Sequence, residues 1–214
     1  MTEAEFAFLR DFLLKRSGLS LSIDKRYLVE SRLGAVCRQH GVPDIGHLAQ
    51  RVRAGQAELG TAVVEAMTTN ETLFFRDALL FQNFRDVMMP ALMKARVGIQ
   101  SRKIRIWCAA ASSGQEPYSL AMLLDDMADR LRGWTVEILA TDISVEMLDK
   151  ARAGVYSQFE VQRGLPIHSL MTHFTQEGDR WRISDRIRRR VVYQQHNLLE
   201  PCLLYTSPSP RDRG

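Results

Sequence analysis

Residues 104–117 read IRIWCAAASSGQEP. A short β-prone run passes into small residues and then into a helix start, where Pro117 suits the first turn. A second β-prone run at 136–141 ends at Asp142, and another helix is expected over about 144–152. Strand, small-residue turn, helix, strand and acid in this order are typical of a βαβ unit. The sequence therefore predicts an α/β fold with a parallel sheet.

The rest of the chain surrounds this unit with helices and one further strand. We expect a helical N-terminal domain over 1–70 and an α/β domain of Rossmann-like type over 71–201, with a third strand at 190–195. A helix is predicted from about residue 73 to Lys94. Residues 202–214 lack periodicity, and we predict a non-native tail there that leaves the sheet incomplete at its C-terminus; a native disordered tail is the alternative.

Composition excludes several classes of protein. The net charge of +4 is too small to indicate nucleic acid by itself, and three scattered cysteines indicate no disulfide framework or zinc site. The five histidines show no metal-ligand spacing either, so no metal is expected. The N-terminus lacks signal-peptide features, and apolar runs fall far short of the ~20 residues of a membrane span. We expect a cytoplasmic monomer without membrane insertion.

The turn after the first strand indicates a ligand other than a dinucleotide. It holds one glycine, Gly114, and not the three of a pyrophosphate-binding loop, and Glu116 would repel phosphates. A carboxylate at a helix start favours a cationic ligand, and S-adenosylmethionine, which carries an ammonium and a sulfonium, satisfies this. The alternative is that Glu116 only complements the helix dipole.

Asp142 closes the second strand, where nucleotide-binding sheets often place an acid. A carboxylate there can accept both hydroxyls of an adenosine ribose. The alternative is that Asp142 caps the next helix, a role that Ser144 could share.

Three segments resemble one family. They read TNETLFFR at 69–76, ASSGQEPYS at 111–119 and ATDI at 140–143, and they follow a helical N-terminal region. In content, order and spacing they resemble the motifs of CheR-type chemotaxis receptor methyltransferases, over essentially residues 1–200. The resemblance implies a protein-glutamate O-methyltransferase that uses S-adenosylmethionine and methylates glutamates on the cytoplasmic helices of chemotaxis receptors.

The resemblance also implies roles for particular residues. It implies one group of residues that line the cofactor and acceptor pocket and a pair of residues near the adenine. It also implies that Glu116 contacts the methionine amine or its surroundings and that Asp142 contacts the ribose. The pocket group is Asn70, Thr72 and Arg76, and the final pair is Asn197 and Leu198. Arg76 would lie closest to the chemistry, as the one catalytic residue. Its planar guanidinium can align a carboxylate that is already ionised, so no strong base is needed. Without the flanking motif, Arg76 would be a solvated charge at a helix start.

The chain departs from the family after the Asn197-Leu198 position. The family continues into a D-x-I-x-x-R-N-V-x-I-Y-F segment whose tyrosine is implicated at the catalytic site, and here residues 205–214 replace it. A non-catalytic docking module for receptor helices therefore stays open as an alternative. A methyltransferase for another substrate, such as RNA or a metabolite, also stays open. Against RNA, nine Lys or Arg balance nine Asp or Glu over 1–75.

Overall fold

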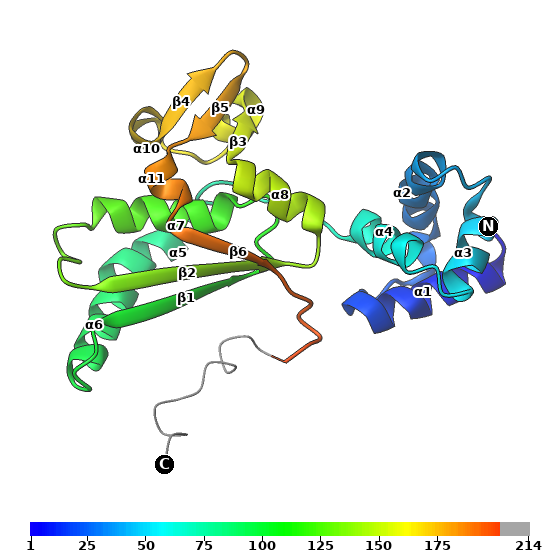
Figure 1. Ribbon diagram of the computed structural model, residues 1–214, viewed down its shortest axis with the longest axis horizontal. Helices are drawn as coiled ribbons and strands as arrows, with labels where there is room; N and C mark the ends of the chain where they lie inside the picture. Colours follow the sequence, from blue (N-terminus) through cyan, green and yellow to red (C-terminus); the bar gives the residue numbers. More distant parts are fainter. Residues whose placement is uncertain (202–214) are drawn as a thin grey trace. The chain divides into compact units, whose positions relative to one another are not determined.

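The computed structural model describes residues 1–201, and the tail predicted for 202–214 lies outside them. The described chain divides into a helical unit, formed by Met1–Thr69 with Asn197–Pro201, and an α/β unit, Asn70–His196 (Figure 1). The predicted fold class is confirmed, because an all-α region precedes a mixed α/β region with a parallel sheet. None of the helices within residues 1–201 has the length and apolarity to cross a bilayer.

The helical unit is built from amphipathic helices around a small apolar core. Thr2 begins the first helix with a capping box, in which its side chain accepts from the Glu5 N–H and its own N–H donates to the Glu5 carboxylate. Phe6, Leu9 and Leu13, spaced for one helical face, are all buried. The elements are α1 (Glu3–Ser17), the short η1 (Ile23–Lys25), α2 (Arg26–Gln39), α3 (Ile45–Arg53) and α4 (Ala57–Met67).

The main sheet of the α/β unit has three parallel strands in the order β1-β2-β6. Helices α7 and α8 follow β1 and β2 and pack on one face, where Tyr193 of β6 lies edge-on to Tyr118 of α7 (Figure 1). On the opposite face the Trp107 indole donates to the Thr141 hydroxyl, 2.9 Å away. The bounds are β1 (Lys103–Ala109), α7 (Gln115–Asp126), β2 (Thr135–Asp142), α8 (Val145–Ala153) and β6 (Val191–Gln195).

The single helix predicted from residue 73 to Lys94 is wrong in two respects. Residues 73–77 form an irregular turn, and the helix begins after Asp77, whose carboxylate accepts from the Leu80 N–H. A π-helical segment then interrupts the helix, because Pro90 has no N–H to donate and the Met89 N–H bonds instead to the Phe84 carbonyl, five residues back. The three pieces are α5 (Ala78–Asn83), η2 (Phe84–Met88) and α6 (Met89–Val97).

A second, antiparallel sheet lies between β2 and β6 in the chain and was not predicted. Its strand order is β3-β5-β4, and it is joined to short helices. The strands are three or four residues long and largely polar, so no alternating apolar pattern marks them. The elements are β3 (Val155–Ser157), α9 (Gln158–Gln162), α10 (Ile167–His173), β4 (Phe174–Glu177), β5 (Arg180–Ile183) and α11 (Asp185–Arg188).

His173 ends α10 and is buried with 1% of its surface exposed. Within the described residues neither ring nitrogen makes a hydrogen bond, and Nε2 lies 3.8 Å from the Asp126 carboxylate. Burial lowers the pKa of His173, while Asp125 and Asp126 oppose that shift. The folded state therefore disfavours protonation of this imidazole, and unfolding makes protonation easier.

This gives the α/β unit a pH-dependent stability with a defined sign. An unfolded histidine has a pKa near ~6.5, so stability should fall as the pH drops below that value. We expect the urea midpoint of tryptophan fluorescence to be lower at pH 5.5 than at pH 7.5, and all three tryptophans lie in this unit. His173→Gln should reduce the difference, whereas His47→Gln, at an exposed position of α3 in the helical unit, should leave it unchanged. Equal pH dependence in the wild type and His173→Gln would contradict this account.

Candidate functional site

The loop between β1 and α7 has an unusual backbone. Ala110, Ser112 and Gly114 all adopt the left-handed region, with φ of 58°, 49° and 92°. Such conformations are unfavourable for alanine and serine and persist where the surroundings fix them. Gly114 is the residue before α7, and a Cβ there would lie 2.7 Å from the Tyr193 hydroxyl and 2.9 Å from the Ala151 Cβ. This glycine is therefore required for packing against β6 and α8.

Asp142 fixes this loop to the end of β2. Its carboxylate is buried, and its two oxygens accept from the Ser112 N–H at 2.7 Å and the Ser144 N–H at 2.9 Å. Ser144, and not Asp142, is the N-cap of α8, because its hydroxyl accepts from the Met147 N–H. The helix-cap alternative for Asp142 is thus wrong. Two carboxylate oxygens offer about four lone-pair sites, so capacity remains for ligand hydroxyls.

Glu116 lies in the first turn of α7 with an exposed side chain. It is a neighbour of Cys108, the second-to-last residue of β1: burial first, and then the Glu116 charge and a hydrogen bond to Glu116, raise the pKa of the Cys108 thiol to about 12. Glu116 therefore lies near the carboxyl end of β1. Ligands of open α/β sheets bind at this edge.

Two hydrogen bonds bring the first motif to the same loop. The Ser112 hydroxyl donates to the Asn70 carbonyl at 2.9 Å, and the Phe75 N–H donates to the Ser119 hydroxyl at 3.0 Å. Thr72, between them, is half-buried. Arg76 is exposed, and within residues 1–201 its guanidinium makes only a long contact of 3.5 Å, from Nη1 to the Glu71 carbonyl.

Asn197 and Leu198 belong to the helical unit and are described within it. The Asn197 amide donates to the Arg16 carbonyl at 2.7 Å and accepts from the Leu199 N–H, and Leu198 is 54% exposed. The residue before them, His196, donates its N–H to the Asp142 carbonyl and so continues the β6 ladder. Their contact with adenine stays a prediction.

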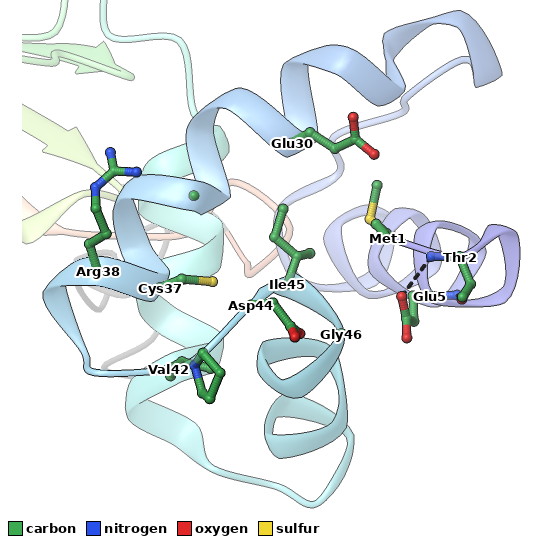
Figure 2. A pocket seen from close by; sticks show the side chains of 12 residues that line it. Met1, Thr2, Glu5, Glu30, Cys37, Arg38, Val42, Asp44, Ile45 and Gly46 are labelled. Atoms are coloured by element: carbon green, nitrogen blue, oxygen red, sulfur yellow. Dashed lines mark hydrogen bonds between the residues drawn. The ribbon is translucent and has the colours of Figure 1, made fainter.

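A depression of about 720 Å³ in the helical unit is a different feature (Figure 2). None of the residues predicted for the site lines it. Its carboxylates already have partners: Glu5 accepts from the Thr2 N–H, Asp44 from the His47 N–H and Glu30 from Arg26. The first two contacts belong to the N-terminal caps of α1 and α3, and the third is an exposed pair within α2.

Sequence reasoning missed the supporting residues of the site. Ser112, Ser119 and Ser144 are buried, and each bonds the backbone of another segment or of a helix start. The available sequence signal for these supporting residues was the presence of hydroxyl side chains on both sides of the small-residue turn. The partners of Ser112 and Ser119 lie 42 and 44 residues away in the sequence, so pattern analysis could not identify them.

Comparison with known proteins decides the family. Residues 70–205 match the S-adenosylmethionine-binding domain of CheR methyltransferases, and residues 4–68 match the all-α domain of the same family. The chain belongs to the CheR methyltransferase family. Chemotaxis protein methyltransferase 1 of Pseudomonas aeruginosa is 42% identical over 92% of this chain and 72% of its own length. The chemotaxis protein methyltransferase of Vibrio parahaemolyticus is 39% identical over 95% of this chain and 74% of its own, and that of Escherichia coli 32% identical over 99% and 71%.

Membership in the CheR family confirms S-adenosylmethionine as the cofactor and methyl transfer as the reaction class. The residues around the β1–α7 loop suit this molecule. An exposed carboxylate, Glu116, lies beside the helix start, and Asp142 keeps lone pairs free at the end of β2. These are acceptors, as an ammonium group and ribose hydroxyls require.

The packing of Gly114 predicts the effect of a substitution on stability. Gly114→Ala should lower the free energy of unfolding of the α/β unit by about 2–4 kcal/mol, because a Cβ would collide with Tyr193 and Ala151 at a left-handed φ. Gly178→Ala is the matched control: its φ is +63° and nothing lies within 4 Å, so only about 1 kcal/mol of backbone strain is expected. Urea denaturation followed by tryptophan fluorescence measures both, and equal losses would refute the packing account.

A matched pair of variants can distinguish a cofactor-binding role of Glu116 from a helix-dipole role. Glu116 and Glu146 both occupy the first turn of a helix, in α7 and α8. We expect Glu116→Gln to weaken S-adenosylmethionine binding about tenfold or more through loss of a charged acceptor, and Glu146→Gln to leave it unchanged. Titration calorimetry measures both constants. Unaltered affinity in Glu116→Gln would leave this carboxylate with the dipole role alone.

Proposed function

We propose that this protein transfers methyl groups from S-adenosylmethionine to glutamate side chains on the cytoplasmic helices of chemotaxis receptors. The observation that carries the proposal is the turn ending at Arg76, which is hydrogen-bonded to the cofactor segment and presents an exposed guanidinium. The relatives named as chemotaxis methyltransferases support the acceptor class. The proposal puts the enzyme in the cytoplasm as a monomer, without a nucleic-acid partner.

The acceptor carboxylate would bind to Arg76. A glutamate has a pKa near ~4.3 and is ionised at neutral pH, so its oxygen needs no base to become a nucleophile. A guanidinium can bond both carboxylate oxygens in one plane and thereby direct one of them. S-Adenosylmethionine supplies a methyl group activated by its sulfonium, and the chain's task is to hold the acceptor oxygen about 3–3.5 Å from that carbon.

The remaining site residues would hold the cofactor. Glu116 would accept from the methionine ammonium and Asp142 from the ribose hydroxyls, in addition to the two backbone bonds it already makes. Asn70 and Thr72 would line the pocket beside Arg76. Asn197 and Leu198, which follow β6, would contact the adenine.

The buried titratable groups nearby agree with direct transfer. Burial is the largest cause of two pKa shifts: it raises the pKa of the Cys108 thiol to about 12 and the pKa of the Tyr118 hydroxyl to about 12. Both groups are therefore protonated at neutral pH, and Cys108 is a poor nucleophile. The Tyr118 hydroxyl donates to the Ala151 carbonyl at 2.7 Å, which engages it in packing.

Calorimetry followed by transfer of tritiated methyl groups tests the proposal. We expect this chain to bind S-adenosylmethionine and to label chemoreceptors in membranes with base-labile methyl esters, with the 42% identical Pseudomonas relative as a positive control. Cofactor binding without transfer would favour the docking module. Base-stable label in RNA, with none in membranes, would overturn the proposal.

Arg76→Ala separates alignment from cofactor binding. Loss of the planar guanidinium should lower kcat for receptor methylation about 100-fold, because a misplaced acceptor reacts slowly. The affinity for S-adenosylmethionine should change much less. Arg130→Ala, an exposed arginine beyond the other end of α7, is the control and should change neither quantity. An equal loss of affinity and transfer in Arg76→Ala would make Arg76 a binding residue only.

A further inference from the structure

Ser119 is a fully buried residue of α7 whose hydroxyl makes two hydrogen bonds. It donates to the Gln115 carbonyl one helical turn back, at 2.7 Å, and accepts from the Phe75 N–H at 3.0 Å. The donation to Gln115 orients the hydroxyl, so that an oxygen lone pair is directed toward Phe75. Ser119 is not among the residues expected to touch cofactor or acceptor.

Phe75 has a backbone that needs such support. Its φ is +47°, a region that bulky side chains rarely adopt. Its ring lies edge-on to Phe81, with centroids 5.0 Å apart, which holds the side chain but not the peptide. The bond from its N–H to Ser119 fixes the peptide plane between Phe74 and Phe75, one residue before Arg76.

The opposite side of the same turn is held by the loop after α9. Gly164 has φ of +86°, and a Cβ there would overlap the Phe74 carbonyl oxygen, so this glycine lets the loop lie against the Phe74 peptide. The neighbouring Arg163 pairs with the Glu71 carboxylate at 3.3 Å. The segment from Glu71 to Arg76 is therefore held between α7 and this loop.

We propose that Ser119 is a positioning residue for methyl transfer, because its hydroxyl fixes the left-handed turn from which Arg76 extends. This inference rests on the function proposed above. Ser119 acts through Arg76, so its removal should disturb alignment of the acceptor and spare the cofactor. A residue that only stabilised α7 would instead affect folding and both ligands alike.

Ser119→Ala tests this by three measurements. We expect the Phe75 amide, observed in ¹⁵N-phenylalanine-labelled protein, to exchange with solvent at least about tenfold faster, since its acceptor is gone. The kcat for receptor methylation should fall about 10-fold to 100-fold, with S-adenosylmethionine affinity within about twofold of the wild type. In an Arg76→Ala background Ser119→Ala should have no further effect on kcat, because the two changes remove one function.

Two variants control for structure. Ser119→Thr keeps the hydroxyl and should restore protection of the Phe75 amide and most of the activity. Ser17→Ala removes a hydroxyl with a similar bond to the carbonyl four residues back, at 2.8 Å in α1, and should change neither activity nor the Phe75 amide. Tryptophan fluorescence during urea denaturation checks that each variant is folded.

The outcomes separate this inference from the proposed function. A wild-type chain that methylates no receptor overturns the proposed function, and the catalytic part of this inference with it. If the wild type is active, unchanged kcat in Ser119→Ala overturns the positioning role. Additive losses in the double variant also overturn it, since Ser119 would then act independently of Arg76.

Discussion

Two backbone N–H groups, those of Ser112 and Ser144, donate to opposite oxygens of the buried Asp142 carboxylate. Hydrogen bonds to an ionised acceptor are strong, and a buried anion requires them. Through Ser112 the carboxylate fixes the left-handed loop after β1, and through Ser144 it fixes the start of α8. The carboxylate that would receive the ribose thus also builds the wall of the site, so cofactor binding and loop geometry depend on one group.

The motif at residues 111–119, which resembles the family in sequence, consists largely of residues that support the site by packing and by hydrogen bonds. Within residues 111–119, Ser112 and Ser119 bond the first motif, Gly114 admits Tyr193 and Ala151, and Tyr118 bonds the Ala151 carbonyl. Glu116 alone has an exposed carboxylate suited to a ligand. The specificity of the motif therefore arises mostly from packing and backbone hydrogen bonds around the cofactor, and to a smaller extent from contacts with it.

The main sheet could be predicted because its strands are rich in β-branched and aromatic residues, and because a small-residue turn follows the first strand and an acid ends the second. The second sheet could not, since strands such as Arg180–Ile183 are short and polar and depend on partners elsewhere in the chain. The break in the helix before β1 was foreseeable from Pro90, but its π-helical form depends on local packing. For the site, residue types suggested Glu116 and Asp142, whereas the bond from the Ser112 N–H to the Asp142 carboxylate joins residues 30 positions apart and has no local sequence signal.

The same long separations bear on how the site forms. The bonds from Asn70 to Ser112 and from Phe75 to Ser119 span 42 and 44 residues, whereas α7 itself is a local structure. Closing loops of that length lowers the chain entropy before the stabilising hydrogen bonds have formed, and non-local contacts of this kind slow folding. The segment bearing Arg76 should therefore become ordered after β1 and α7 have docked. Ribosomal synthesis would have to pass residue 119 before the turn at Phe75 could acquire its native backbone.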